Sequence, residues 1–205
     1  MIKKTFGVLI AICAVVSTVI VVSPVVFYLF GLRLIPIQAR TIPSQVLPPK
    51  AMTVFWASLG GTGELRIERN NPYTLIWRIW KYAGYSIRPE NRVTMLGARA
   101  LLRNVPQLRG FQWQLAYASA GIWVGQHWTA EQAISAYLSK ANFGNNFFGL
   151  DAAAQGYFGL SSANLSLEQM ARLVVAANSS TILNPWSRPD ENQAAARWVV
   201  SRLPP

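Results

Sequence analysis

Four arginines that lie close together in the sequence are the first residues whose type and spacing could support chemistry. They are Arg92, Arg99, Arg103 and Arg109. A guanidinium group can bind a phosphate through two parallel hydrogen bonds. The cluster therefore predicts a binding site for a phosphate or pyrophosphate group. The alternative is that the same arginines face the headgroups of anionic lipid.

Two carboxylates upstream, Glu64 and Glu68, are the residues that could act as a general base. A positioned carboxylate accelerates a reaction by accepting a proton from the attacking group. The two are also spaced i, i+4 and interleaved with Arg66 and Arg69, which is a common pattern on a solvent-exposed edge. Both interpretations stay open at this point.

Metal and cofactor chemistry has little support in the sequence. His127 is the only histidine, and Cys13 is the only cysteine, inside an apolar N-terminal segment. Neither has a cluster of carboxylates around it, and the sequence contains no phosphate-cradling or dinucleotide-binding glycine motif. We therefore expect no metal site and no cofactor, and we expect His127 to pack beside Trp128 or to cap a helix.

The N-terminal segment predicts a single transmembrane helix. Residues 5–32 contain no charged side chain and follow Lys3 and Lys4. This apolar run is longer than the core of a cleaved secretory signal, which is the alternative interpretation. We expect residues 1–32 to form a cytoplasmic tip and a membrane span, with the rest of the chain outside the cytoplasm.

The net charge of +11 is concentrated in the first half of the body. Residues 33–110 carry twelve Lys and Arg against three Glu, whereas residues 111–205 carry five basic and five acidic residues. A basic surface beside a membrane is typical of proteins that contact anionic headgroups or phosphate-bearing ligands. Nucleic acid is excluded as a partner because the body is expected outside the cytoplasm.

The body is predicted to be mainly α-helical. Residues 33–50 are rich in proline and predict an extended linker, and residues 53–58 (TVFWAS) resemble a short strand. Helices are predicted from Pro72 through Arg78 and Lys81, over residues 91–104 and over 111–128. Capping boxes at Thr129 and Ser166 and a proline at 189 predict three more helices. We expect residues 51–205 to form one domain.

The segment from residue 131 onward carries an ordered series of family motifs. It contains AYL, FG, G-x-x-x-A-A-x-x-Y-F-G and N-P elements in that order. In this pattern the chain closely resembles the family 51 peptidoglycan glycosyltransferases. These are the lysozyme-like transglycosylase domains of class A penicillin-binding proteins and of their monofunctional, membrane-anchored relatives. The matching residues include Ile134, Tyr137, Leu138, Phe143, Gly144, Gly149, Ala153, Ala154, Tyr157, Phe158, Gly159, Asn184 and Pro185. The resemblance implies a lysozyme-like, mainly helical domain behind one transmembrane helix.

The upstream motifs of the family are not preserved. The signature E-D-x-x-F-x-x-H-x-G falls on residues 60–69, where Gly60 and Gly61 replace Glu and Asp. In the family that first Glu takes the proton from the sugar 4-hydroxyl of lipid II, and glycine has no group that can do so. The R-K-x-x-E helix falls on residues 113–117 without its charges. Of the S-T-x-T-x-Q loop only Thr94 agrees, followed by Ala98 and Arg99.

The resemblance therefore implies a noncatalytic relative in cell-wall assembly, anchored by one span in the bacterial inner membrane. Such a protein would bind a lipid-linked precursor, a glycan strand, or a synthase or division partner. Thr94, Arg99, Arg103 and Arg109 are its candidate substrate-binding residues. The alternative is an active but divergent transglycosylase that uses Glu64 or Glu68 as base, after a shift of four or eight residues in the alignment. A third hypothesis is a basic membrane-surface module unrelated to the cell wall.

Overall fold

The computed structural model describes residues 2–44, 47–75, 88–103, 105 and 108–203. Within these residues the chain is mainly α-helical, and its only β pairing is an isolated bridge between Asn142 and Phe148. This confirms the predicted fold class. The elements are α1 (Ile2–Arg33), η1 (Ile37–Ala39), α2 (Pro49–Ser58), α4 (Pro89–Leu102), α5 (Gly110–His127), α6 (Ala130–Leu138), α7 (Leu150–Phe158), η2 (Ser162–Asn164), α8 (Leu167–Asn178) and α9 (Pro189–Val200).

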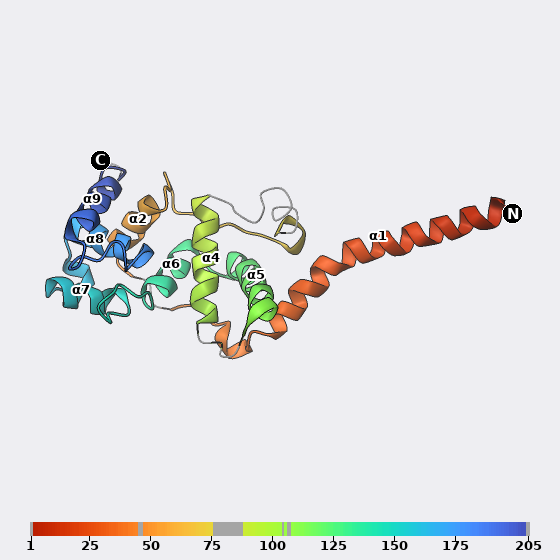
Figure 1. The fold of residues 1–205 in the computed structure, drawn as a ribbon, viewed down its shortest axis with the longest axis horizontal. Coiled ribbons are helices and arrows are strands. Elements are labelled where there is room, and N and C mark those ends of the chain that lie inside the picture. The colour runs from red at the N-terminus through yellow and green to blue at the C-terminus, as the bar shows by residue number, and fades with distance from the viewer. Residues whose placement is uncertain (1, 45–46, 76–87, 104, 106–107, 204–205) are drawn as a thin grey trace.

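Helix α1 projects away from the rest of the molecule (Figure 1). Its apolar part, Ile10–Arg33, has 24 residues and a mean hydropathy of 2.7, and almost none of it is buried. At about 1.5 Å per residue this part is about 36 Å long, enough to cross a hydrocarbon layer of about 30 Å. It is the one helix among the described residues that is long and apolar enough to span a membrane, which fits the predicted single-pass protein.

The body has two groups of helices joined by α6. Helices α4 and α5 lie on the side of α1, whereas α2, α7, α8 and α9 lie on the far side (Figure 1). The closest helix pairs are α4 with α5 and α6, α8 with α9 and α2, and α1 with α5. Helix α6 thus contacts both groups and connects the two halves of the core.

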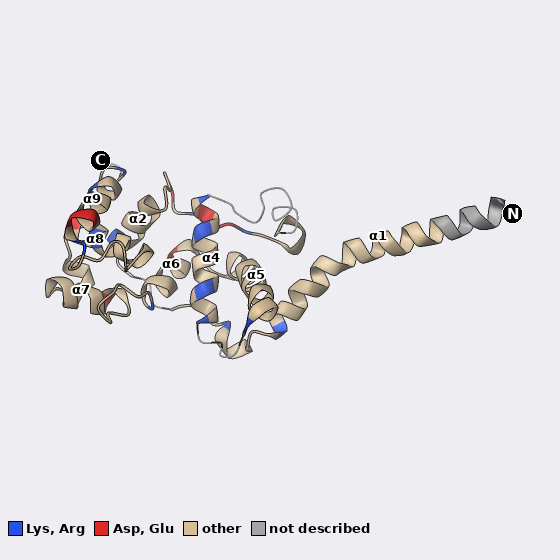
Figure 2. Ribbon diagram, in the orientation of Figure 1, with Lys and Arg blue, Asp and Glu red and all other residues tan. Residues whose placement is uncertain are grey.

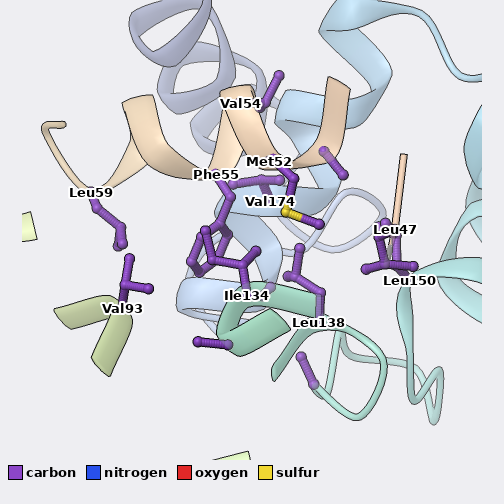
Figure 3. Close-up of a cluster of buried hydrophobic side chains, with 14 of the residues drawn as sticks. Leu47, Met52, Val54, Phe55, Leu59, Val93, Ile134, Leu138, Leu150 and Val174 are labelled. Carbon is purple, nitrogen blue, oxygen red and sulfur yellow. The ribbon is translucent and has the colours of Figure 1, made fainter. Parts of the chain in front are cut away.

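The centre of the core lies where α2, α6 and α8 meet (Figure 3). Phe55 of α2, Ile134 and Leu138 of α6, and Val174 of α8 are all fully buried there. Leu47, from the predicted linker, is buried in the same cluster, and its backbone N–H donates a hydrogen bond to Ser135 Oγ at 3.0 Å. The chain before α2 therefore packs against the domain.

The predicted strand at residues 53–58 is wrong, because this segment forms most of α2. A short, continuous apolar run has no period that distinguishes a strand from a buried helix. Here α2 is covered on most of its faces by α6, α8 and α9, so an apolar residue is required at nearly every position. Pro49 at the first helical position favours the helix, because proline fixes the backbone angle that a helix needs there.

The other helix predictions agree with the structure wherever it describes them. Helices α4, α5, α6, α8 and α9 occur where they were expected, and both capping boxes are formed, Thr129 with Gln132 and Ser166 with Gln169. The helix predicted from Pro72 is present through Leu75. The rest of that prediction, with Arg78 and Lys81, lies outside the described residues.

Candidate functional site

Two of the four clustered arginines lie side by side in a cleft. Arg99 of α4 and Arg103, one turn later at the C-cap of that helix, line an open cavity of about 330 Å³ together with Trp113 of α5, Tyr137 of α6 and Lys140 just after α6. The remaining described lining residues are Ala100 and Leu102. Figure 2 shows basic residues recurring along α4. Within the described lining, the cleft therefore has three cationic side chains and no carboxylate.

Gly97 brings the three helices of the cleft together. A Cβ atom at this position would lie 2.9 Å from Ala133 Cβ on α6 and 2.9 Å from Val124 Cγ1 on α5. Any side chain larger than hydrogen would push α5 and α6 away from α4. Gly97 therefore lets α4 pack closely on α5 and α6, the helices that carry Trp113 and Tyr137 of the cleft.

Tyr137 forms a rigid wall of the cleft. Its hydroxyl donates a hydrogen bond to the carbonyl oxygen of Ala177 at 3.0 Å, and its ring packs against Phe55 with centroids 5.7 Å apart. Burial raises the pKa of this hydroxyl above its usual value. The positive charges of Arg99, Arg103 and Arg92 oppose that rise in the pKa. Tyr137 therefore stays neutral near pH 7, and three arginine charges act on the same region.

Trp113 lines the cleft from α5. Its ring stacks on Tyr117 at 4.8 Å with an interplanar angle of 20°. The Tyr117 hydroxyl donates a hydrogen bond to the carbonyl oxygen of Met95 on α4 at 3.2 Å. Burial also raises the pKa of Tyr117, and Arg99 opposes this rise. In the alignment proposed from the sequence, the Arg and Glu of the R-K-x-x-E motif fall on this stacked pair, and its Lys falls on Gln114.

This arrangement suits anion binding better than proton transfer. Arginine and lysine donate charge-assisted hydrogen bonds to phosphate oxygens, which are stronger than bonds between neutral groups. Flat aromatic walls provide an apolar surface for a sugar or lipid stem. Among the described lining residues, no side chain can accept a proton at neutral pH, because the only ionisable groups are cations and a tyrosine with a raised pKa.

The other predicted binding residues do not line the described part of the cleft. Thr94 is fully buried, and its hydroxyl donates to the carbonyl oxygen of Glu90 at 2.9 Å and accepts from the N–H of Glu68 at 3.0 Å. It therefore fastens the chain near residue 68 to α4. Arg109 is exposed at the residue that precedes α5.

The two candidate bases lie in the irregular segment between α2 and residue 72. The Glu64 side chain is 87% exposed and forms an ion pair with Arg66 at 3.7 Å. Exposed pairs of this kind contribute about 0–1 kcal/mol to stability, and water surrounds the carboxylate. Glu68 lies beside α4, where its backbone bonds to Thr94. Neither residue belongs to the described lining of the cleft.

The glycines at the expected base position have a structural role of their own. Gly60 N–H donates to the carbonyl oxygen of Ala57 at 2.9 Å, and Gly61 N–H donates to that of Trp56 at 3.0 Å. This pair of bonds is the Schellman motif that ends many helices, and it places Gly60 at φ +83°. A Cβ at Gly61 would collide with the Trp56 ring. The pair therefore ends α2 in a conformation that L-residues rarely adopt.

We expect Gly60→Ala to lower the free energy of unfolding by about 1 kcal/mol, because a Cβ is strained in the left-handed region. Gly60→Asn should cost less, since asparagine tolerates this region better. Denaturant titration of the purified chain in detergent measures both. Equal stability of Gly60→Ala and the wild type would contradict the assignment of Gly60 as the residue that ends α2.

Two residues of the cleft, Lys140 and Trp113, were not predicted from the sequence as ligand-binding groups. Lys140 lies three residues after Tyr137, just beyond the end of α6, and Trp113 lies four residues before Tyr117 on the same face of α5. This spacing was a usable signal. The sequence could not show that Arg99 and Arg103 line the same cavity as Trp113 and Lys140.

Comparisons with known proteins agree with this fold. The profile of a family described as Transglycosylase matches residues 94–204. A biosynthetic peptidoglycan transglycosylase of Vibrio parahaemolyticus is 33% identical over 76 residues, which is 37% of this chain and 34% of the relative. A second one, from Marinomonas, is 38% identical over 68 residues, covering 32% and 30%. Penicillin-binding protein 1C of Escherichia coli is 28% identical over 135 residues, covering 65% and 17%. The matches thus span about a third or less of the length of each relative.

Proposed function

Because this chain belongs to the transglycosylase family, we propose that it is a membrane-anchored module that binds a lipid-linked, pyrophosphate-bearing sugar and does not polymerise it. The observation that carries this proposal is the cleft of Arg99, Arg103 and Lys140 between two aromatic walls, without a carboxylate in its described lining. The names of the relatives point to peptidoglycan as the glycan class. Lipid II or a nascent glycan strand is therefore the proposed ligand.

The position of Gly60 supports a binding role over catalysis. General acid–base catalysis is worth about 10² to 10⁴ in rate, and a glycine that ends a helix cannot supply it. The remaining candidates, Glu64 and Glu68, are outside the described lining of the cleft. The arginines of the cleft still supply the positive charge that holds the pyrophosphate.

The proposed setting is the inner membrane of a bacterium, with the body outside the cytoplasm. In this arrangement residues 1–32 anchor the chain, residues 33–50 connect the anchor to the domain, and residues 51–205 carry the cleft. The basic α4 would then lie close to the headgroups, where lipid-linked precursors present their pyrophosphate. The proposed protein partners of this chain are cell-wall synthases and division proteins, which would meet the precursor while it is bound and unconverted.

A polymerisation assay separates the binding role from divergent catalysis. The full chain is incubated in detergent with labelled lipid II, and glycan products are resolved on a gel beside Glu64→Gln and Glu68→Gln variants. We expect no polymer from any of the three proteins. Polymer that is made by the wild type and lost in one variant would overturn the noncatalytic proposal and identify the base.

A vesicle control separates ligand binding from simple adhesion to lipid. Binding is measured to vesicles of phosphatidylglycerol alone and to the same vesicles containing a small fraction of lipid II. We expect tighter binding with lipid II at equal surface charge. Equal binding to both would instead support a basic membrane-surface module.

A further inference from the structure

An apolar groove lies on the side of α5 that faces away from the cleft. It has a volume of about 250 Å³ and lies between the anchor and the body. Its walls include Pro24 and Phe27 of α1, and Phe111, Leu115, Ala118 and Ile122 of α5. The four α5 residues recur at helical spacing and form one stripe, whereas Trp113 and Tyr117 lie on the opposite face.

The groove belongs to a firm junction between α1 and the body. At Gly31 a Cβ atom would overlap the Ser119 side chain, so α1 and α5 approach each other closely there. Further toward the N-terminus of α1, the Tyr73 hydroxyl donates a hydrogen bond to the carbonyl oxygen of Val21 at 2.9 Å. These two contacts hold the anchor against the body on both sides of the groove.

The groove lies at the depth of the bilayer hydrocarbon if α1 spans the membrane. Arg33 ends the span, and the Arg40 side chain donates hydrogen bonds to the carbonyl oxygens of Leu32 and Ile35 at 2.7 Å each. These two arginines mark the water boundary. Tyr28 and Pro24 are then about 8 and 14 Å below it along the helix, within the outermost 15 Å or so of the hydrocarbon layer.

We propose that this groove holds one acyl chain of a bilayer phospholipid. Filling an apolar groove with water is unfavourable. At this depth the neighbouring molecules are lipid chains. The proposal rests on α1 spanning the membrane and is independent of the binding role of the cleft. The bound chain fixes the depth of α5, and because α5 also carries Trp113, it sets the height of the cleft above the bilayer.

Fluorescence quenching by brominated lipid tests this proposal. Ala118→Cys is introduced in a Cys13→Ser background, labelled with bimane and reconstituted into phosphatidylcholine vesicles with brominated acyl chains. Ala152→Cys, on the exposed face of α7 far from α1, is the matched control (Figure 1). Wild-type Cys13, exposed within the span, is the positive reference. We expect quenching at residue 118 comparable to that at residue 13, and none at residue 152.

Filling the groove provides a second readout. Native mass spectrometry of the full chain in mild detergent should find one phospholipid retained by the wild type and by Ala152→Trp, and none retained by Ala118→Trp. Ala118→Trp should still bind lipid II, which separates failure of this proposal from failure of the proposed function. An unquenched label at residue 118, equal phospholipid retention by all three proteins, or a retained polyprenyl lipid in place of a phospholipid would each overturn the proposal.

Discussion

Replacing Arg99 and Arg103 together with alanine should weaken the binding of a pyrophosphate-linked sugar by about a hundredfold. A hydrogen bond to a charged group contributes about 1.5–3 kcal/mol, and each 1.4 kcal/mol changes affinity tenfold. We use the lower end of that range for each arginine because both side chains are exposed to water. Each single substitution should therefore cost about tenfold.

Calorimetry with a soluble pyrophosphate-linked disaccharide measures this effect. Arg103→Lys should lie between the wild type and Arg103→Ala, because lysine keeps the charge but loses the paired geometry. Arg197→Ala, an exposed arginine on α9, is the control for loss of net charge and should bind as the wild type does. A loss of affinity in Arg197→Ala as large as that in Arg99→Ala would show that general charge, and not the cleft, holds the ligand.

Phe55→Ala should lower the free energy of unfolding by about 4 kcal/mol. Phe55 is fully buried where α2, α6 and α8 meet, and removal of a buried phenyl ring leaves a cavity that the surrounding helices fill only in part. The ring also supports Tyr137 at 5.7 Å. We therefore expect weaker ligand binding at temperatures where the variant is still folded, because one wall of the cleft loses its support.

Guanidinium titration of the detergent-solubilised chain measures the change in stability. Phe148→Ala makes the same chemical change at a side chain that is 52% exposed, and it should cost less than about 1 kcal/mol. Similar losses in the two variants would contradict the placement of Phe55 at the centre of the core.

Local signals in the sequence predicted most of the helices. Thr129 and Ser166 are hydrogen-bonded to residues three positions away, so their capping boxes depend on the adjacent chain alone. The span is equally local, because its length and composition determine it. These features needed no knowledge of the tertiary structure, and the structure agrees with them.

The features that decide the site depend on contacts between distant segments. The strand prediction for residues 53–58 failed because other helices pack against α2 on most of its faces. Nearly every position of this helix is therefore apolar. Gly60 ends α2 because its φ angle is positive, and this angle cannot be read from the sequence. Arg99 and Lys140 share a cleft only because α4 packs on α6 near Gly97. Thr94, which matched a family motif, is occupied by its bonds to residues 68 and 90.

The cleft is proposed to hold a lipid-linked pyrophosphate and to leave it intact. Phosphorus NMR of lipid II mixed with excess full chain in detergent observes both parts of this claim at once. We predict that the two pyrophosphate signals shift on binding and that their combined intensity then stays constant with time. The appearance of free polyprenyl pyrophosphate, the product released by glycosyl transfer, would contradict the account.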